Sequence, residues 1–229
     1  MGEKKKKEAE VAVWKKAVVV GACILFVFLM IISGMGSGWL SMFSSVKSGD
    51  TVVVDYTLYD SAGSPIVTTD QQVYTSVAKA GGDILYGRQL TMVANKSITQ
   101  AVYPVDVYVG ETGLAQEFAI FAPEYNTISS SVVGMKANEK KKITLMTSGT
   151  SQFWDSETLQ NNGITLDQVS VGSIFAMGVS SNPNATATNS SEKTYLRVAE
   201  VVRKVPTGVT VDFGYPTAEI KVVSFGSTN

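Results

Sequence analysis

The segment Thr51–Leu58, with the sequence TVVVDYTL, decides the fold class that we expect for this chain. Its residues are β-branched or aromatic with a period of two, and turn-forming residues follow at Asp60–Pro65. Further strands are predicted at six segments: Val105–Val109, Glu117–Phe121, Lys141–Met146, Tyr195–Lys204, Val209–Phe213 and Glu219–Phe225. Helical signals are few, at Ser156–Gln160 and Leu166–Val169. We therefore expect an α+β fold, mostly antiparallel β-sheet with little helix.

A charge-free stretch, Ala17–Ser45, precedes this region, and its first part, Ala17–Ile32, is almost wholly apolar. Roughly 20 apolar residues are needed to cross a bilayer. Lys15 and Lys16 flank its inner end, so the positive-inside rule predicts a cytoplasmic N-terminus. A cleaved signal peptide, cut near Gly34–Gly38, is the alternative. The expected organisation is a cytoplasmic basic tail at residues 1–16, a transmembrane helix and exit linker in the lipid bilayer at residues 17–45, and an extracytoplasmic domain at residues 46–229.

The composition excludes several kinds of chemistry. The chain has no histidine, and its single cysteine, Cys23, lies inside the apolar stretch. Ser-His-Asp catalysis, Cys/His zinc sites and intrachain disulfides are therefore excluded. No clustered aspartate loop of the calcium-binding type is present, so we expect no metal and no cofactor. The positive charge is concentrated in the short N-terminal tail while the rest is acidic, which argues against nucleic acid as a partner.

Three segments fit the N-glycosylation pattern, with Asn95, Asn184 and Asn189 as the acceptors. Two of them lie in the polar stretch Asn182–Ser191, which is predicted to be a loop. Such sites are usable only if the domain is translocated, so this placement agrees with an extracytoplasmic location.

Three blocks, in order along the chain, carry a family resemblance: Lys47–Leu58 (KSGDTVVVDYTL), Val133–Ile143 (VGMKANEKKKI) and Val209–Pro216 (VTVDFGYP). Together they resemble the FKBP-type peptidyl-prolyl isomerases of the SlyD-like branch, which carry a domain inserted in the flap. The resemblance implies an FKBP-like sheet wrapped on a short helix near Ser129–Val133. It also implies a β-rich flap lobe at about residues 155–206, of the kind that binds unfolded chains in this family.

The resemblance also implies where a prolyl-isomerase pocket would lie. The candidate pocket residues are Tyr56, Ile66, Val67, Tyr125, Ile128 and Ser151. The family's pocket aspartate aligns with Val67, and Asp70 lies three residues further along the chain. The family's flap tyrosine aligns with Ser151. No residue is assigned as catalytic, because these replacements remove the polar contacts to the peptide bond that the family's aspartate and tyrosine make. The alternative is that the apolar members of this set are ordinary core residues.

Four residues are candidates for gripping a client chain: Phe153, Trp154, Ile174 and Phe175. Exposed apolar patches often mark interaction sites, whereas a buried tryptophan would be structural. We therefore expect a membrane-anchored folding factor that binds unfolded or proline-containing polypeptides, with weak or lost isomerase activity. A non-catalytic envelope scaffold or interaction module is the alternative.

Overall fold

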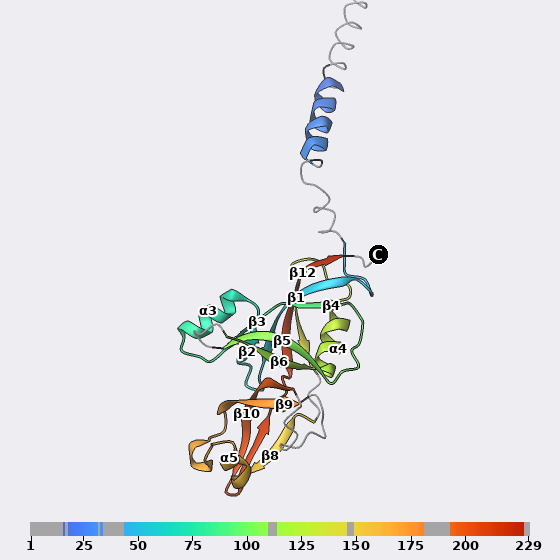
Figure 1. Ribbon diagram of the computed structural model, residues 1–229. Coiled ribbons are helices and arrows are strands. Elements are labelled where there is room, and N and C mark those ends of the chain that lie inside the picture. The colour runs from blue at the N-terminus through green and yellow to red at the C-terminus, as the bar shows by residue number, and fades with distance from the viewer. Residues whose placement is uncertain are drawn as a thin grey trace, which may run out of the picture. The chain divides into compact units, whose positions relative to one another are not determined.

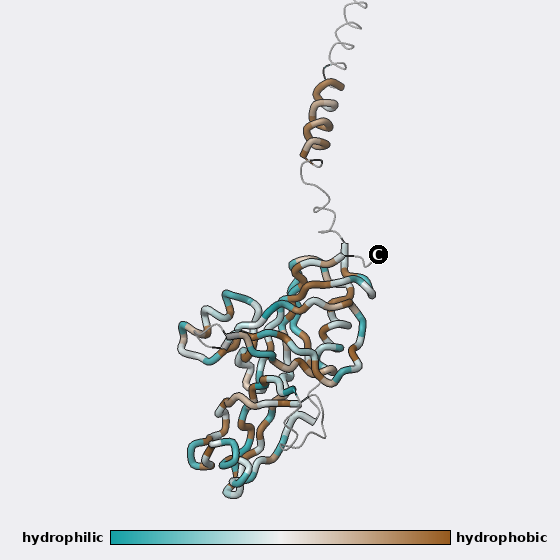
Figure 2. Tube along the Cα trace, in the orientation of Figure 1, coloured by the Kyte–Doolittle hydropathy of each residue, from teal (hydrophilic) through white to brown (hydrophobic). Residues whose placement is uncertain are grey.

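The computed structural model describes residues 16, 18–31, 33, 44–109, 114–145, 149–180 and 193–226. The chain divides into two compact units, Met1–Ser44 and Ser45–Asn229. In the first unit residues 18–31 are helical, and this helix is predominantly apolar (Figures 1 and 2). Among the described residues, no helix has both the length and the apolarity needed to span a membrane. Most of the predicted tail and exit linker lies outside the described residues.

The second unit is built mainly from strands (Figure 1). These are β1 (Thr51–Tyr59), β2 (Pro65–Thr68), β3 (Leu85–Gly87), β4 (Leu90–Val93), β5 (Val102–Val109), β6 (Leu114–Phe121), β7 (Lys140–Thr144), β8 (Ser151–Asp155), β9 (Ile174–Ser180), β10 (Thr194–Val205), β11 (Gly208–Asp212) and β12 (Thr217–Gly226). The helices are α3 (Gln71–Lys79), α4 (Ala122–Ser131), α5 (Ser156–Asn161) and a 3₁₀ turn, η1 (Leu166–Gln168). The predicted α+β class, with many strands and little helix, is confirmed.

The strands form one mixed sheet in the order β7-β12-β1-β2-β3-β5-β6-β10-β11-β8, with β4 beside β1 and β9 beside β10. The pairs β2–β3 and β6–β10 are parallel, and the other pairings in the described residues are antiparallel. β1 is central because it pairs with β12 along its whole length, from Thr51 opposite Gly226 to Tyr59 opposite Thr217. It is the segment from which the fold was predicted.

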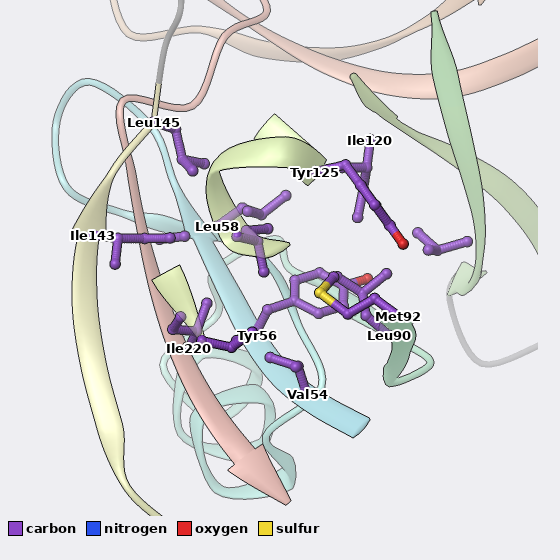
Figure 3. Packing of buried hydrophobic residues seen from close by; sticks show 14 of the residues in the cluster. Val54, Tyr56, Leu58, Leu90, Met92, Ile120, Tyr125, Ile143, Leu145 and Ile220 are labelled. Atoms are coloured by element: carbon purple, nitrogen blue, oxygen red, sulfur yellow. The ribbon is translucent and has the colours of Figure 1, made fainter. Parts of the chain in front are cut away.

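The main core lies under β1. Its alternate residues Val52, Val54, Tyr56 and Leu58 are buried, as the period-two pattern requires. Figure 3 shows Tyr56 beside Leu90 and Met92 of β4. Helix α4 contributes Tyr125 and Ile128 to the same cluster. The helix expected near Ser129–Val133 therefore exists, but it begins earlier, because Pro123 suits a first helical turn and the Glu124 side chain accepts a hydrogen bond from the Phe121 N–H.

A second core is built by β8, β9, β10, β11 and α5, around Trp154, Leu159 and Val201. Its buried members run along the chain from Trp154 to Phe213. The lobe expected at residues 155–206 overlaps this cluster, and the cluster also draws on β8 and β11 at either end. This part of the chain therefore has an apolar centre of its own.

A buried ion pair lies where the two cores meet. The Arg197 guanidinium of β10 donates to both carboxylate oxygens of Glu124 in α4, at 2.5 and 3.0 Å, and to the carbonyl oxygens of Ala119 and Phe213, at 2.6 and 2.7 Å. Its central carbon lies 4.0 Å from the centre of the Tyr215 ring, in cation–π contact. Glu124 and Arg197 are both fully buried, so each needs the other as its counter-charge inside the protein.

Candidate functional site

The predicted pocket residues are core side chains in the structure. Tyr56, Ile66, Val67, Tyr125 and Ile128 all belong to the main core cluster and are at most 5% exposed. The structure thus places these five in one cluster, and two of them also line cavities at its surface, Ile66 one of about 210 Å³ and Tyr125 one of about 320 Å³. The sixth, Ser151, lies apart on β8, where it is exposed and pairs with Asp212 of β11.

The Tyr56 hydroxyl is buried, and it has no hydrogen-bond partner among the described residues. It faces the backbone of Gly87 so closely that a Cβ added there would lie 2.8 Å from the hydroxyl oxygen. Burial raises the pKa of Tyr56 above its ordinary value, because the phenolate would lose its hydration. The hydroxyl therefore stays protonated, and it points into the core.

Asp70, the nearest carboxylate to the replaced family aspartate, has a structural role. It is the N-cap of α3, and its carboxylate accepts a hydrogen bond from the Gln72 N–H at 2.9 Å. It also forms an ion pair with Lys140 of β7 at 3.5 Å. A carboxylate with these partners stabilises the N-terminus of a helix.

An apolar cleft of about 210 Å³ lies where β2 and the end of the α3–β3 connection meet β9. It is lined by Ile66 from the predicted pocket, by Ile174 and Phe175 from the predicted client grip, and by Ile84 and Leu85. Two sets of residues predicted for separate roles thus meet in one cleft. Ile84 and Leu85 were not predicted, although an apolar pair that follows Gly81-Gly82-Asp83 has the pattern of a strand after a turn.

The other two residues predicted to grip a client lie outside this cleft. Trp154 is buried, and its ring lies 5.3 Å from that of Phe175, so it supports the cleft wall from behind. Phe153 is 55% exposed, and its ring covers Gly208, where an added Cβ would come within 2.9 Å of the ring. Phe153 therefore shields a glycine in the neighbouring strand.

Strand β9 forms one wall of the cleft, and it is an edge strand. Within the described residues it pairs only with β10, from Ile174 opposite Glu200 to Ser180 opposite Thr194. Its sequence, IFAMGVS, contains no charged residue and no proline, the usual devices that protect an edge. Ile174 is 42% exposed at the cleft. In the described part of the chain, no second strand pairs with β9 on the side away from β10, and this side lies next to an apolar cavity.

The structure describes one of the three predicted glycosylation acceptors. Asn95 is exposed with a positive φ of 60°, and its side-chain amide donates to the Ser48 hydroxyl at 3.2 Å. Asn184 and Asn189 lie outside the described residues. Within the ranges that the structure describes, no three His, Cys, Asp or Glu side chains are grouped so that they could hold a metal ion.

No model of a known protein family matches this chain, and a search of curated proteins finds no significant relative. The cleft, the edge strand and the sequence are therefore the basis for assigning a function.

Proposed function

We propose that this chain is a membrane-anchored folding factor, in which an FKBP-like domain at residues 46–229 binds unfolded or proline-containing polypeptide segments outside the cytoplasm. The observation that carries the proposal is the apolar cleft beside β9, which has no second strand partner among the described residues. An extended client segment would add to this edge as a strand and place an apolar side chain in the cleft. Strand addition gives affinity through the main chain, and a pocket selects the side chain.

The size of the cleft supports a peptide side chain as its occupant. Pockets for small-molecule ligands usually have volumes of about 300–1,000 Å³. At about 210 Å³ this cleft is smaller and suits one side chain of a client. Its walls are Ile, Leu, Phe, Ala and Val side chains, and Asp83 is the only charged residue that the described part of the chain contributes to them.

We propose that isomerase turnover is weak or lost. Turnover requires contacts that are stronger in the twisted amide than in the planar one. The positions that match the family's polar residues hold Val67, which is buried, and Ser151, which lies on β8. The hydroxyl of Tyr56 is enclosed in the core. Each kcal/mol of lost transition-state stabilisation slows a reaction roughly fivefold, so two or three missing contacts would remove most of the catalysis.

The membrane anchor is supported by the lysine-flanked, charge-free sequence, and the helical residues 18–31 belong to that stretch. External protease applied to intact cells should digest the domain and leave a membrane-embedded stub. A domain found free of membrane, with its N-terminus near Gly34–Gly38, would contradict this part of the proposal.

The test of client binding uses the full-length chain in a mild detergent with a reduced, aggregating client protein. Wild type should suppress aggregation, and Ile174→Asp should lose most of this activity, because a charge in the cleft wall opposes apolar burial. Val171→Asp is the matched control, since Val171 is 62% exposed and does not line the cleft. Exchange of an X–Pro peptide, followed by NMR, should remain close to the uncatalysed rate.

Two outcomes would contradict the proposal. Isomerase rates typical of the FKBP family would reject the argument for a lost catalytic site. Failure to suppress aggregation, with no exchange either, would reject client binding and favour the envelope scaffold.

A further inference from the structure

A row of tyrosines lies on the face of β3 opposite the cleft. Leu85 lines the cleft, and the next residue, Tyr86, faces the other way, as alternation along a strand requires. The Tyr86 ring lies 6.5 Å from that of Tyr108 in β5 and 5.3 Å from that of Tyr74 in α3, measured between ring centres. We call the cavity beside these rings the tyrosine groove; its volume is about 530 Å³, and it is lined by Tyr86 and Tyr108 and by residues that include Thr69, Gly87, Arg88 and Gln89, with Tyr74 packed against Tyr86.

Arg88 supplies the tyrosine groove with N–H donors, and the tyrosine, threonine and glutamine side chains that line it can donate as well as accept. The nearby carboxylate of Asp55 already accepts from the Thr69 hydroxyl at 3.0 Å and from the Gln89 amide at 2.9 Å. The carboxylate of Asp106 is paired with Arg88 at 3.4 Å. Arg88 also donates to the Tyr108 hydroxyl at 3.2 Å, and an arginine has five N–H groups. A ligand would therefore meet aromatic faces and the remaining N–H groups of Arg88, beside carboxylates that already accept from groove side chains.

Strand addition cannot explain this surface. β3 pairs with β2 on one side and with β5 on the other, so it has no open edge. A ligand here has to bind through its side chains and its carbonyl oxygens.

We propose that the tyrosine groove binds a proline-rich segment in the polyproline II conformation. Such a segment has no internal hydrogen bonds, its prolines lack N–H groups, and its carbonyl oxygens point outwards in need of donors. Proline rings pack well on aromatic side chains, and the stiff conformation loses little entropy on binding. The tyrosine groove offers aromatic rings for the prolines and hydrogen-bond donors for the carbonyl oxygens in one place. This inference concerns a surface separate from the cleft, so it stands or falls independently of the proposed function.

The test measures binding of fluorescein-labelled deca-proline to the full-length chain in mild detergent by fluorescence anisotropy. A glycine–serine peptide of the same length, which is flexible, serves as the comparison probe. Deca-proline should bind saturably, and the glycine–serine peptide should not. Tyr86→Ala should weaken binding by about tenfold, the scale of one lost aromatic contact, whereas Tyr86→Phe should stay within about threefold because the ring is retained.

Three further variants distinguish a specific loss of binding from misfolding. Arg88→Gln changes an exposed side chain and should weaken binding by about threefold through lost donors. Tyr195→Ala removes a tyrosine of β10 that does not line the groove, and it should leave binding unchanged. Ile174→Asp, the cleft variant, should also bind deca-proline normally.

Four results would overturn the inference. They are the absence of saturable deca-proline binding, equal binding of the glycine–serine peptide, an equal loss in Tyr195→Ala, and a loss in Ile174→Asp. The last would place the peptide in the cleft.

Discussion

Arg197 shows how much a single residue contributes to joining the two cores. Burial disfavours its charged form, but the nearby charge of Glu124 and their hydrogen bond outweigh that cost, so the pKa of Arg197 is raised above its ordinary value. Arg197 therefore stays charged at neutral pH. Removing either partner would leave the other one buried without its counter-charge, which costs far more than the pair itself contributes.

We predict that Arg197→Met destabilises the protein by about 3–5 kcal/mol, because Glu124 would remain buried without a counter-charge. The measurement is the free energy of unfolding in urea. The matched control is Lys193→Met, which removes an exposed ion pair with Glu117 and should cost much less stability. Equal losses of unfolding free energy in the two variants would contradict a larger effect of breaking the buried pair.

The sequence could not have revealed this pair. Arg197 lies in the predicted strand Tyr195–Lys204, and that strand is confirmed as part of β10. A charged residue in a strand is expected to face solvent, because arginine is rarely buried. Its partner Glu124 lies in another element, and one sequence carries no signal that connects them.

At the scale of elements, the strands with regular alternation and the short elements α5 and η1 were predicted, whereas β3, β4 and α3 were not. β1, β10, β11 and β12 were predicted because their apolar residues alternate over many positions. β3 and β4 are only three and four residues long, too short for a periodic pattern. Helix α3 is only nine residues long and none of them is fully buried, so its short apolar stripe, Val73 and Val77, gives a weak sequence signal.

Helix α3 is also stabilised by its N-cap, Asp70. Partial burial pushes the pKa of Asp70 up, but hydrogen bonds from the Gln72 and Val73 N–H groups and the charge of Lys140 push it down further, so the net pKa is lowered. A carboxylate with a lowered folded-state pKa stabilises the protein above its unfolded-state pKa. This contribution is lost as the pH falls through the folded-state pKa.

We therefore predict that Asp70→Ala costs about 1 kcal/mol at neutral pH, and that the difference from wild type shrinks below about pH 4. Urea unfolding of both proteins across this pH range measures it. Asp70→Asn should retain most of the stability at neutral pH, since asparagine also caps helices, and Asp167→Ala, at an exposed position, is the control. A loss in Asp70→Ala that is constant down to low pH would contradict the role of the charge.

For the whole molecule, the candidate site was predicted only in pieces. Ile66, Ile174 and Phe175 were each selected from the sequence, but their meeting in one cleft depends on β9 packing near β2 and β3, which are far away along the chain. The buried positions of Tyr56 and Tyr125 result from the same kind of packing between distant segments. Alternation shows that a residue faces inwards, but it does not show whether a cavity or a filled core lies there.

The two cores lead to a prediction about excision. Removing residues 150–213 and joining the ends with a short glycine linker is sterically reasonable, because the Leu145 N–H donates to the Pro216 carbonyl oxygen at 2.9 Å. The excision also removes Arg197, the counter-charge of Glu124, together with the strand that covers this carboxylate. We predict that Glu124→Gln costs less stability in the excised chain than in the full-length chain, because only the full-length chain then keeps a buried Arg197 without its counter-charge.

Urea unfolding followed by circular dichroism compares the excised chain with and without Glu124→Gln. In the full-length chain the same substitution should be destabilising, because Arg197 then loses its counter-charge. An equal loss of stability in both backgrounds would contradict the proposed dependence.

The position of β12 between β7 and β1 has a consequence for how the protein is made. β1 is synthesised early and β12 late, with Thr51 opposite Gly226 in the finished sheet. Until β12 emerges, β1 and β7 both keep an unpaired side, and the main core cannot close. Pairings between such distant segments form slowly. The nascent chain therefore passes through a long aggregation-prone stage, during which a protein proposed to assist folding would itself need protection.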